Sequence, residues 1–402
     1  MSENKPGSKT GKKSSRVKQI TNKIVETLSR KKENNPHYSS ERIRKLKAVF
    51  NIVIGKRSNG KTFDWKTDLL RGYAADRRYR GVYIRRKDTE VLPKNIAPLF
   101  ELPTEDAITG EPVPQIADIF EGEFNSYEYK NRAFTLALRN EETGEIIKRD
   151  TQPFCFTCAL ATWENRKGVD VGEVRSICFD EFMTREPYLR DEFVKFMNVL
   201  SSFIRDRDTA TIWMLANTVN KYCPYFEEMG LNQVDSMEPG TIQLYRMGAE
   251  GQTTIAVEMC ASDEGSKKVE KYFAFDNPQL EMITSGSWEI ALYPHCPCEM
   301  TKEDIVHRFY VLFNNKVIAG DIMQDEDYLF ILYHYHYPDR EFTKDDILYL
   351  PTNDGLINHC KHISDTPTEV HKLIYHLIKT EREFYASNEV GEVIRNWKIN
   401  VA

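Results

Sequence analysis

A glycine-rich octet that follows an apolar segment constrains this chain more than any other feature of its sequence. Residues 48–54 read AVFNIVI, and the octet follows directly as Gly55, Lys56, Arg57, Ser58, Asn59, Gly60, Lys61 and Thr62. It matches the pattern G-x-x-x-x-G-K-[ST] at every fixed position. The backbone N–H groups of such a loop cradle phosphates when a buried strand precedes it and a helix follows. The sequence therefore predicts a loop that binds a nucleoside triphosphate.

The residue types in this octet fit that chemistry. Gly55 and Gly60 permit backbone conformations that turn successive N–H groups toward a phosphate. Lys61 is expected to reach the β- and γ-phosphates of ATP, and the Thr62 hydroxyl is expected to hold Mg²⁺. The helix that starts there adds its positive end. We therefore expect ATP and Mg²⁺ as cofactors.

Two acidic residues at the end of a second apolar segment complete the predicted site. In SICFDEF, Asp180 closes a predicted strand and Glu181 follows it. A phosphate loop needs a carboxylate on a neighbouring strand to hold Mg²⁺, and Asp180 suits that role. Glu181 is placed to polarise a water molecule for attack on the γ-phosphate. The pair indicates hydrolysis rather than transfer to a small acceptor.

Two further positions border the next predicted strand, TIWMLAN. Asn217 ends the strand, where its carboxamide would sense the γ-phosphate or position the water; a turn or capping asparagine is the alternative. Before the strand, in IRDRD, Arg205 or Arg207 would reach ATP on a neighbouring subunit and stabilise transition-state charge in trans. A surface network of these arginines with Asp206 and Asp208 is the alternative.

The order of predicted elements indicates two folded domains. Segments typical of strands and helices alternate up to about Tyr222, which predicts an α/β fold: a P-loop NTPase core with a largely parallel sheet. Aromatic-rich strands and a helix near the C-terminus predict a smaller α+β domain. The predicted divisions are a basic, partly disordered arm at 1–45, an ATPase domain at 46–225, a linker or lid subdomain at 226–290 and a C-terminal domain at 291–402.

Four segments, in this order and spacing, resemble the DNA-packaging motor ATPases of small podoviruses with protein-primed linear genomes. They read NIVIGKRSNGKT, YIRRK, ICFDEFMTRE and SSFIRDRDTATIWMLANTVNKYCPYF. The resemblance covers residues 46–230 and continues weakly through FAFDNPQL and RFYVLFNNKVIAGDIM. It implies an additional-strand, catalytic-glutamate ATPase core, and a C-terminal domain with an RNase H-like fold that has lost nuclease activity.

The resemblance also implies residue roles and partners. By position, Lys61 and Thr62 bind ATP and magnesium, Asp180 is the Walker B acid, Glu181 is the catalytic acid and Arg205 is the trans finger. The implied assembly is a homo-oligomeric ring, pentameric in relatives, that packages double-stranded genomic DNA. It would act in the host cytoplasm, docked at the portal of the viral procapsid.

The charge of the chain is unevenly distributed. Residues 1–47 hold fourteen Lys or Arg against four Asp or Glu, on a chain whose net charge is −6. This basic arm departs from the family pattern. It suggests a polyanionic partner, with DNA, the portal or a packaging RNA as candidates, although such a composition is also typical of a disordered tail. Within the arm, residues 16–33 carry apolar side chains at helical spacing and predict a helix.

The sequence shows no apolar run of about 18 residues and no signal segment, so we expect a cytoplasmic, non-membrane protein. Two other functions stay open. Another ring ATPase of the helicase or conjugation type would share these motifs, and a nucleotide-gated adaptor would bind ATP without turnover. Dependence on procapsids separates the first from a packaging motor, and ATP turnover by the isolated chain excludes the second.

The remaining motifs are expected to be structural. Cys155 and Cys158 form a lone C-x-x-C within an apolar strand, where core cysteines are expected rather than zinc or redox chemistry. His334 and His336 are expected to pack on one strand face. The acids of residues 321–327 cluster in one stretch, unlike the convergent carboxylates of a two-metal nuclease.

Overall fold

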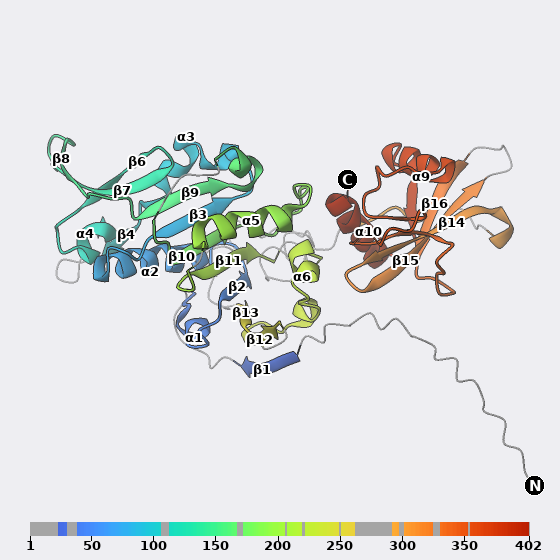
Figure 1. The fold of residues 1–402 in the computed structure, drawn as a ribbon, viewed down its shortest axis with the longest axis horizontal. Coiled ribbons are helices and arrows are strands. Elements are labelled where there is room, and N and C mark those ends of the chain that lie inside the picture. The colour runs from blue at the N-terminus through green and yellow to red at the C-terminus, as the bar shows by residue number, and fades with distance from the viewer. Residues whose placement is uncertain are drawn as a thin grey trace, which may run out of the picture.

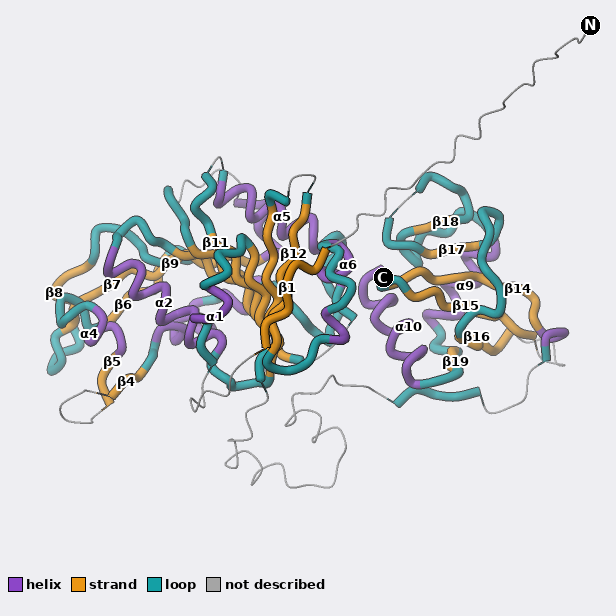
Figure 2. The backbone as a smooth tube through the Cα atoms, turned by 90° about the horizontal axis from the view of Figure 1, so that it is seen from below, coloured by secondary structure: helices purple, strands orange, loops and turns teal. Residues whose placement is uncertain are grey.

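The computed structural model of this protein contains two domains, which lie side by side in Figures 1 and 2. The larger domain is built on an eleven-stranded sheet and the C-terminal domain on a six-stranded sheet. Among the described residues, no helix is long and apolar enough to cross a membrane. The structure describes residues 23–29, 38–105, 112–166, 172–205, 207–218, 222–248, 251–261, 292–296, 301–324, 330–352 and 354–401.

A mostly parallel sheet forms the frame of the larger domain. Its strand order is β1-β12-β13-β2-β11-β10-β3-β9-β7-β6, with β8 paired to β7, and the central strands from β13 to β9 run parallel. This arrangement confirms the predicted α/β class. The strands are β1 (Lys23–Ser29), β2 (Phe50–Gly55), β3 (Gly81–Arg85), β6 (Ser126–Lys130), β7 (Ala133–Arg139), β8 (Ile146–Arg149), β9 (Cys155–Ala159), β10 (Ser176–Asp180), β11 (Thr211–Asn217), β12 (Thr241–Met247) and β13 (Thr253–Met259).

The two faces of this sheet carry separate apolar cores. In β2, Ile52 and Ile54 belong to one core and Val53 belongs to the other. Helix α5 (Glu192–Ile204) packs on the first face and helix α2 (Lys61–Ala75) on the second. Because both faces are covered, the central strands read as continuous apolar runs rather than as alternating ones.

Shorter elements extend this frame. Strands β7 and β8 form a hairpin and pair antiparallel, with Arg139 opposite Ile146. Gly144 has φ +70°, a left-handed conformation that glycine adopts without a steric penalty. The remaining described α-helices and strands of this domain are α1 (Glu41–Arg44), α3 (Pro93–Ile96), the antiparallel pair β4 (Pro103–Glu105) and β5 (Pro112–Pro114), α4 (Gln115–Ile119) and α6 (Pro224–Glu228).

Two sequence predictions differ from the structure at one edge of the sheet. The helix predicted at 16–33 is wrong over Lys23–Ser29, because these residues form β1 and pair antiparallel with β12. In the described part of the segment predicted as a linker or lid, 226–290, strands β12 and β13 join the main sheet, and β13 pairs directly with β2. Sheet pairing between distant segments outweighed the local helical pattern. The rest of the basic arm before residue 38 lies outside the described residues.

The C-terminal domain has a mixed sheet of order β18-β17-β14-β15-β16-β19. β14, β15 and β16 are antiparallel, while β17 and β18 run parallel beside β14. This order and these directions fit the RNase H-like fold that the resemblance implied, with β19 added beside β16. The elements are β14 (Ile305–Phe313), β15 (Lys316–Gln324), β16 (Phe330–His336), β17 (Ile347–Tyr349), β18 (His359–Cys360), α9 (Glu369–Lys379), β19 (Glu383–Tyr385) and α10 (Asn388–Val401).

Polar contacts join the two domains. Helix α10 lies on the side of its domain that faces α6 (Figures 1 and 2). The Arg395 guanidinium donates to the main-chain oxygen of Arg185 at 2.9 Å, and the Arg185 guanidinium lies 3.4 Å from the Glu392 carboxylate. Lys361 forms a further ion pair with Asp191 at 2.9 Å.

Candidate active site

The predicted phosphate loop connects β2 to α2. Gly60 precedes the first helical residue with φ +96°, so it needs the left-handed freedom of glycine. Gly55 does not have a positive φ. A Cβ at Gly55 would lie 2.7 Å from Cys260 Cβ and 2.9 Å from the Asn59 amide, so glycine is needed there for close approach. The two glycines therefore serve different purposes.

The Lys61 ammonium lies inside this loop. Its Nζ donates to the main-chain oxygens of Gly55 at 3.2 Å and Lys56 at 2.7 Å, and to the side-chain oxygens of Asn59 at 3.0 Å and Asn217 at 3.3 Å. Only 6% of Lys61 is exposed, and burial lowers the pKa of its amine. An anionic phosphate at the loop would counteract that effect, because a nearby negative charge favours the ammonium form.

Asp180 ends β10 beside the start of α2, as predicted. The Thr62 hydroxyl donates to Asp180 Oδ2 at 3.0 Å, and the Tyr83 hydroxyl donates to the same oxygen at 2.7 Å. Burial and the nearby Asp180 raise the pKa of Tyr83 well above its usual value, so its phenol stays a hydrogen-bond donor. Hydroxyl and carboxylate oxygens are the ligand types that Mg²⁺ prefers. Thr62 and Asp180 therefore fit a magnesium site.

Glu181 follows Asp180 with φ +55°, a conformation that is uncommon for glutamate. Its carboxylate accepts a hydrogen bond from Arg85 Nη2 at 2.6 Å, and the same nitrogen donates to Glu90 at 2.5 Å. The Glu181 side chain is 56% exposed, whereas that of Arg85 is 16% exposed. In this arrangement one carboxylate oxygen of Glu181 is engaged by a guanidinium.

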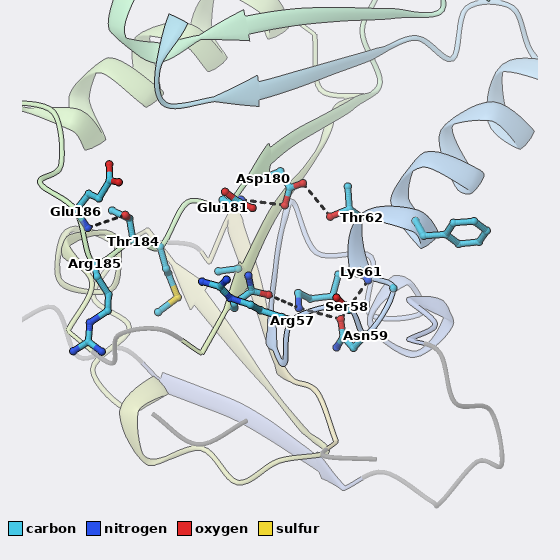
Figure 3. Close-up of a pocket in the computed structure, with 15 residues that line it drawn as sticks. Arg57, Ser58, Asn59, Lys61, Thr62, Asp180, Glu181, Thr184, Arg185 and Glu186 are labelled. Atoms are coloured by element: carbon cyan, nitrogen blue, oxygen red, sulfur yellow. Dashed lines mark hydrogen bonds between the residues drawn. The ribbon is translucent and has the colours of Figure 1, made fainter. Parts of the chain in front are cut away.

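These groups surround one cavity of about 680 Å³, a size suited to a nucleotide. Figure 3 shows the loop residues and Asp180 on one side, with Thr184, Arg185 and Glu186 across the opening. Asn217 lines the cavity as well, as its strand pairs with β2 and places it opposite Gly55. The lining residues are Arg57, Ser58, Asn59, Gly60, Lys61, Thr62, Phe63, Asp180, Glu181, Met183, Thr184, Arg185, Glu186, Ala216 and Asn217.

The two candidate finger arginines lie away from this cavity. Both precede β11, so they are at the opposite edge of the parallel sheet from the loop, roughly 20 Å away at the rise of a strand. Arg205 is exposed and has φ +51°. The Arg207 guanidinium donates to the main-chain oxygen of Gly172 at 2.7 Å. Neither side chain serves its own cavity, so a catalytic role for either one requires a neighbouring subunit.

The residues of YIRRK had no predicted role beyond their part in the resemblance. The structure places Tyr83 at Asp180, Arg85 at the Glu181 carboxylate and Arg86 at the main chain beyond it. A role near Asp180 and Glu181 could have been predicted, because YIRRK stands at the end of an apolar segment typical of a strand in a parallel sheet. The residues at that end meet the acids that end β10.

Among the residues that the structure describes, none from the motifs expected to be structural lines the cavity. Cys155 and Cys158 are both buried and form no disulfide, and they belong to cores on opposite faces of the sheet, so they do not converge. Asp321 is 3% exposed and accepts hydrogen bonds from Arg308 at 2.5 and 2.8 Å and from His336 at 3.0 Å. Asp325, Glu326 and Asp327, and the His334 side chain, lie outside the described residues. Among the side chains that are described, no group of three or more His, Cys, Asp or Glu residues is arranged to hold a metal ion.

A comparison with known protein families agrees with the resemblance seen in the sequence motifs. Residues 141–238 match the model of the podovirus DNA encapsidation protein, Gp16. This match confirms the resemblance over a segment that holds Asp180, Glu181, Arg205 and Asn217. The phosphate loop lies outside the matched residues. No curated protein matches the chain.

Several solved structures are similar at low identity. The packaging motor of phage Phi-28, gp11, is 15% identical with a TM-score of 0.49, over 92% of this chain and 99% of that one. The genome-packaging motor assembly of bacteriophage Phi-29 is 17% identical with a TM-score of 0.49, over 90% and 100%. The ATPase domain of the large terminase of Thermus phage P74-26 is 12% identical with a TM-score of 0.39, over 63% and 93%.

Proposed function

We propose that this chain is an ATP-driven translocase that packages double-stranded DNA into a viral procapsid, with ATP hydrolysed at the subunit interfaces of a homo-oligomeric ring. The observation that carries the proposal is the convergence of Lys61, the Thr62–Asp180 pair and Glu181 on one cavity. The encapsidation-family match over residues 141–238 supports DNA as the substrate. Docking at the portal and action in the host cytoplasm belong to the same proposal, and DNA, the portal and a packaging RNA are the candidate partners of the basic arm.

Under this proposal each group has one task. The loop N–H groups and Lys61 bind the triphosphate, and Thr62 and Asp180 would hold Mg²⁺, which neutralises phosphate charge when bound. Glu181 orients the attacking water and accepts its proton. Asn217, held at 3.3 Å from Lys61, contacts the γ-phosphate end of the cavity. Arg205 completes the site of the adjacent subunit.

The pairing of Glu181 with Arg85 supports an inactive state of the site, in which the Glu181 carboxylate is held by Arg85 and does not contact the attacking water. A carboxylate oxygen that accepts from a guanidinium is less available to a water molecule than a free one. Glu181 would therefore act after it leaves Arg85. Its half-exposed side chain has room to move, because it faces the cavity (Figure 3).

The decisive experiment measures ATP hydrolysis by the purified chain with and without double-stranded DNA and with and without procapsids that carry a portal. A packaging motor is expected to hydrolyse ATP, to be stimulated by DNA and to translocate DNA only when procapsids are present. DNA unwinding or movement without procapsids would favour the helicase or conjugation type. Nucleotide binding without turnover under every condition would favour an adaptor.

Replacing Arg85 by methionine is expected to raise hydrolysis in the absence of DNA. The Arg85–Glu181 pair is worth roughly 1 kcal/mol after screening of the exposed Glu181 carboxylate by solvent, so freeing Glu181 should raise the rate about fivefold. Arg85→Lys, which keeps the charge, is the matched control and should stay near the wild-type rate. If Arg85→Met instead lowers the rate as far as loss of Glu181 does, Arg85 assists the chemistry rather than restraining it.

A further inference from the structure

Arg86 follows Arg85 directly, but its guanidinium contacts the main chain of residues 180–182, called the catalytic segment below, rather than the cavity. Its side chain is 8% exposed. Nη1 donates to the main-chain oxygen of Glu181 at 3.2 Å, and Nη2 donates to that of Phe182 at 2.5 Å. Arg86 is not one of the described residues that line the cavity. It therefore acts on the catalytic glutamate through the main chain.

The other side of the guanidinium is held by Glu192. Arg86 Nε donates to the two carboxylate oxygens of Glu192 at 3.1 and 2.8 Å. Glu192 also accepts from the Leu189 N–H at 2.8 Å and from the Tyr225 hydroxyl at 2.9 Å. A buried charge pair is retained at little cost only when its remaining hydrogen-bonding groups are also satisfied, as they are here.

The peptide that Arg86 holds is a strained one. Glu181 has φ +55°, in the left-handed region that residues with a Cβ rarely occupy. Such conformations persist where the surroundings fix them. Two donors from one rigid, planar guanidinium fix the carbonyls of Glu181 and Phe182, which flank the Cα of Phe182, and so hold the Glu181 main chain from its C-terminal side. This conformation sends the Glu181 side chain toward the cavity, where Figure 3 shows it beside Asp180.

We propose that Arg86 is a positioning residue for ATP hydrolysis, which holds the Glu181 main chain in the left-handed conformation that aims its carboxylate at the attacking water. The proposal rests on the proposed function. Arg85 and Arg86 then have separate tasks: Arg85 engages the carboxylate of Glu181, and Arg86 fixes the backbone that carries it. Glu192 keeps Arg86 in place from the side away from the catalytic segment.

Two variants separate positioning from folding. Arg86→Met combined with Glu192→Gln removes both charges. The glutamine oxygen can accept from the Leu189 N–H while its amide nitrogen donates to the Tyr225 hydroxyl, so the thermal midpoint should fall less than that of Glu192→Gln alone, which leaves a buried unpaired charge. The kcat of this double variant for ATP should fall about 100-fold, because a small misplacement of a catalytic group has that effect. KM and nucleotide affinity should change by less than about threefold, since the phosphate loop is untouched.

Glu192→Gln alone is the matched control. It leaves Arg86 buried without its charge partner but keeps both donors to the Glu181 and Phe182 carbonyls, so it should be the less stable variant and the more active one. A purely structural role predicts the reverse order, with activity following stability. If the double variant matches the wild-type kcat, the positioning role is overturned while the proposed function stands. If the wild type itself shows no turnover with DNA, the proposed function is what fails.

Discussion

Replacing Lys61 by alanine is expected to abolish ATP binding under ordinary assay conditions, with Kd rising about 1000-fold. Charge-assisted hydrogen bonds to phosphates are worth roughly 1.5–3 kcal/mol each, and Lys61 is placed to make two of them. A loss of about 4 kcal/mol corresponds to that change in Kd. Binding of a fluorescent ATP analogue, measured by titration, checks the expectation. Hydrolysis should fall with it.

The fold should tolerate this change better than the function does. Burial lowers the pKa of Lys61, which means that the folded chain holds its charged form at a cost. Lys61→Met, which keeps most of the side-chain volume without the charge, is the control for packing. Both variants should melt near the wild-type temperature, and both should lose ATP. ATP binding by Lys61→Met at wild-type affinity would show that the loop does not depend on this ammonium group.

The core of the site could be predicted from the sequence because its signals are local. The loop octet, the acids that end β10 and the asparagine that ends β11 each sit directly after an apolar run. In a parallel sheet the ends of such runs meet at one edge. The structure brings Lys61, Asp180 and Asn217 together at that edge, as the pattern indicated.

The arginine contacts that hold the Glu181 side chain and main chain could not be predicted in the same way. Arg85 meets Glu181, and Arg86 meets Glu192, across about a hundred residues of intervening chain. Nothing in YIRRK tells which arginine takes the carboxylate and which takes the main chain. That choice depends on how strand β3 ends beside β10, which only the fold determines. Strand β1 shows the same limit, since its partner β12 lies more than two hundred residues away.

Helix α5 connects the segment that positions Glu181 to the candidate finger Arg205, two features that the sequence predictions did not link. It begins at Glu192, which holds Arg86 beneath the catalytic segment, and it ends at Ile204, immediately before Arg205. A helix of thirteen residues spans roughly 20 Å as one stiff unit. Under the proposed function, a shift of the catalytic segment in one subunit would be carried along α5 to the finger that serves its neighbour.

The roles of Glu181 and Arg205 can be tested by mixing subunits, because each residue is proposed to act in a different subunit of one interface. Glu181→Gln is expected to bind ATP normally and to lower kcat by at least about 1000-fold, because it removes the proton acceptor and keeps the shape. Arg205→Ala should lower kcat by a similar factor, since a trans arginine contributes about 10³-fold or more to phosphoryl transfer. Each homogeneous ring is then inactive for a different reason. Steady-state hydrolysis at saturating ATP and DNA measures both.

A mixture of the two variants should recover activity. A Glu181→Gln subunit has an intact Arg205 to offer, and an Arg205→Ala subunit has an intact Glu181 to receive it. In a random equal mixture about a quarter of the head-to-tail interfaces combine them in that order, so up to a quarter of the wild-type rate is expected. Arg207→Ala mixed in the same way is the control. Recovery with Arg207→Ala, together with full activity of homogeneous Arg205→Ala rings, would move the finger to Arg207. No recovery with either arginine variant at any ratio would return both to the surface network and leave each cavity to work alone.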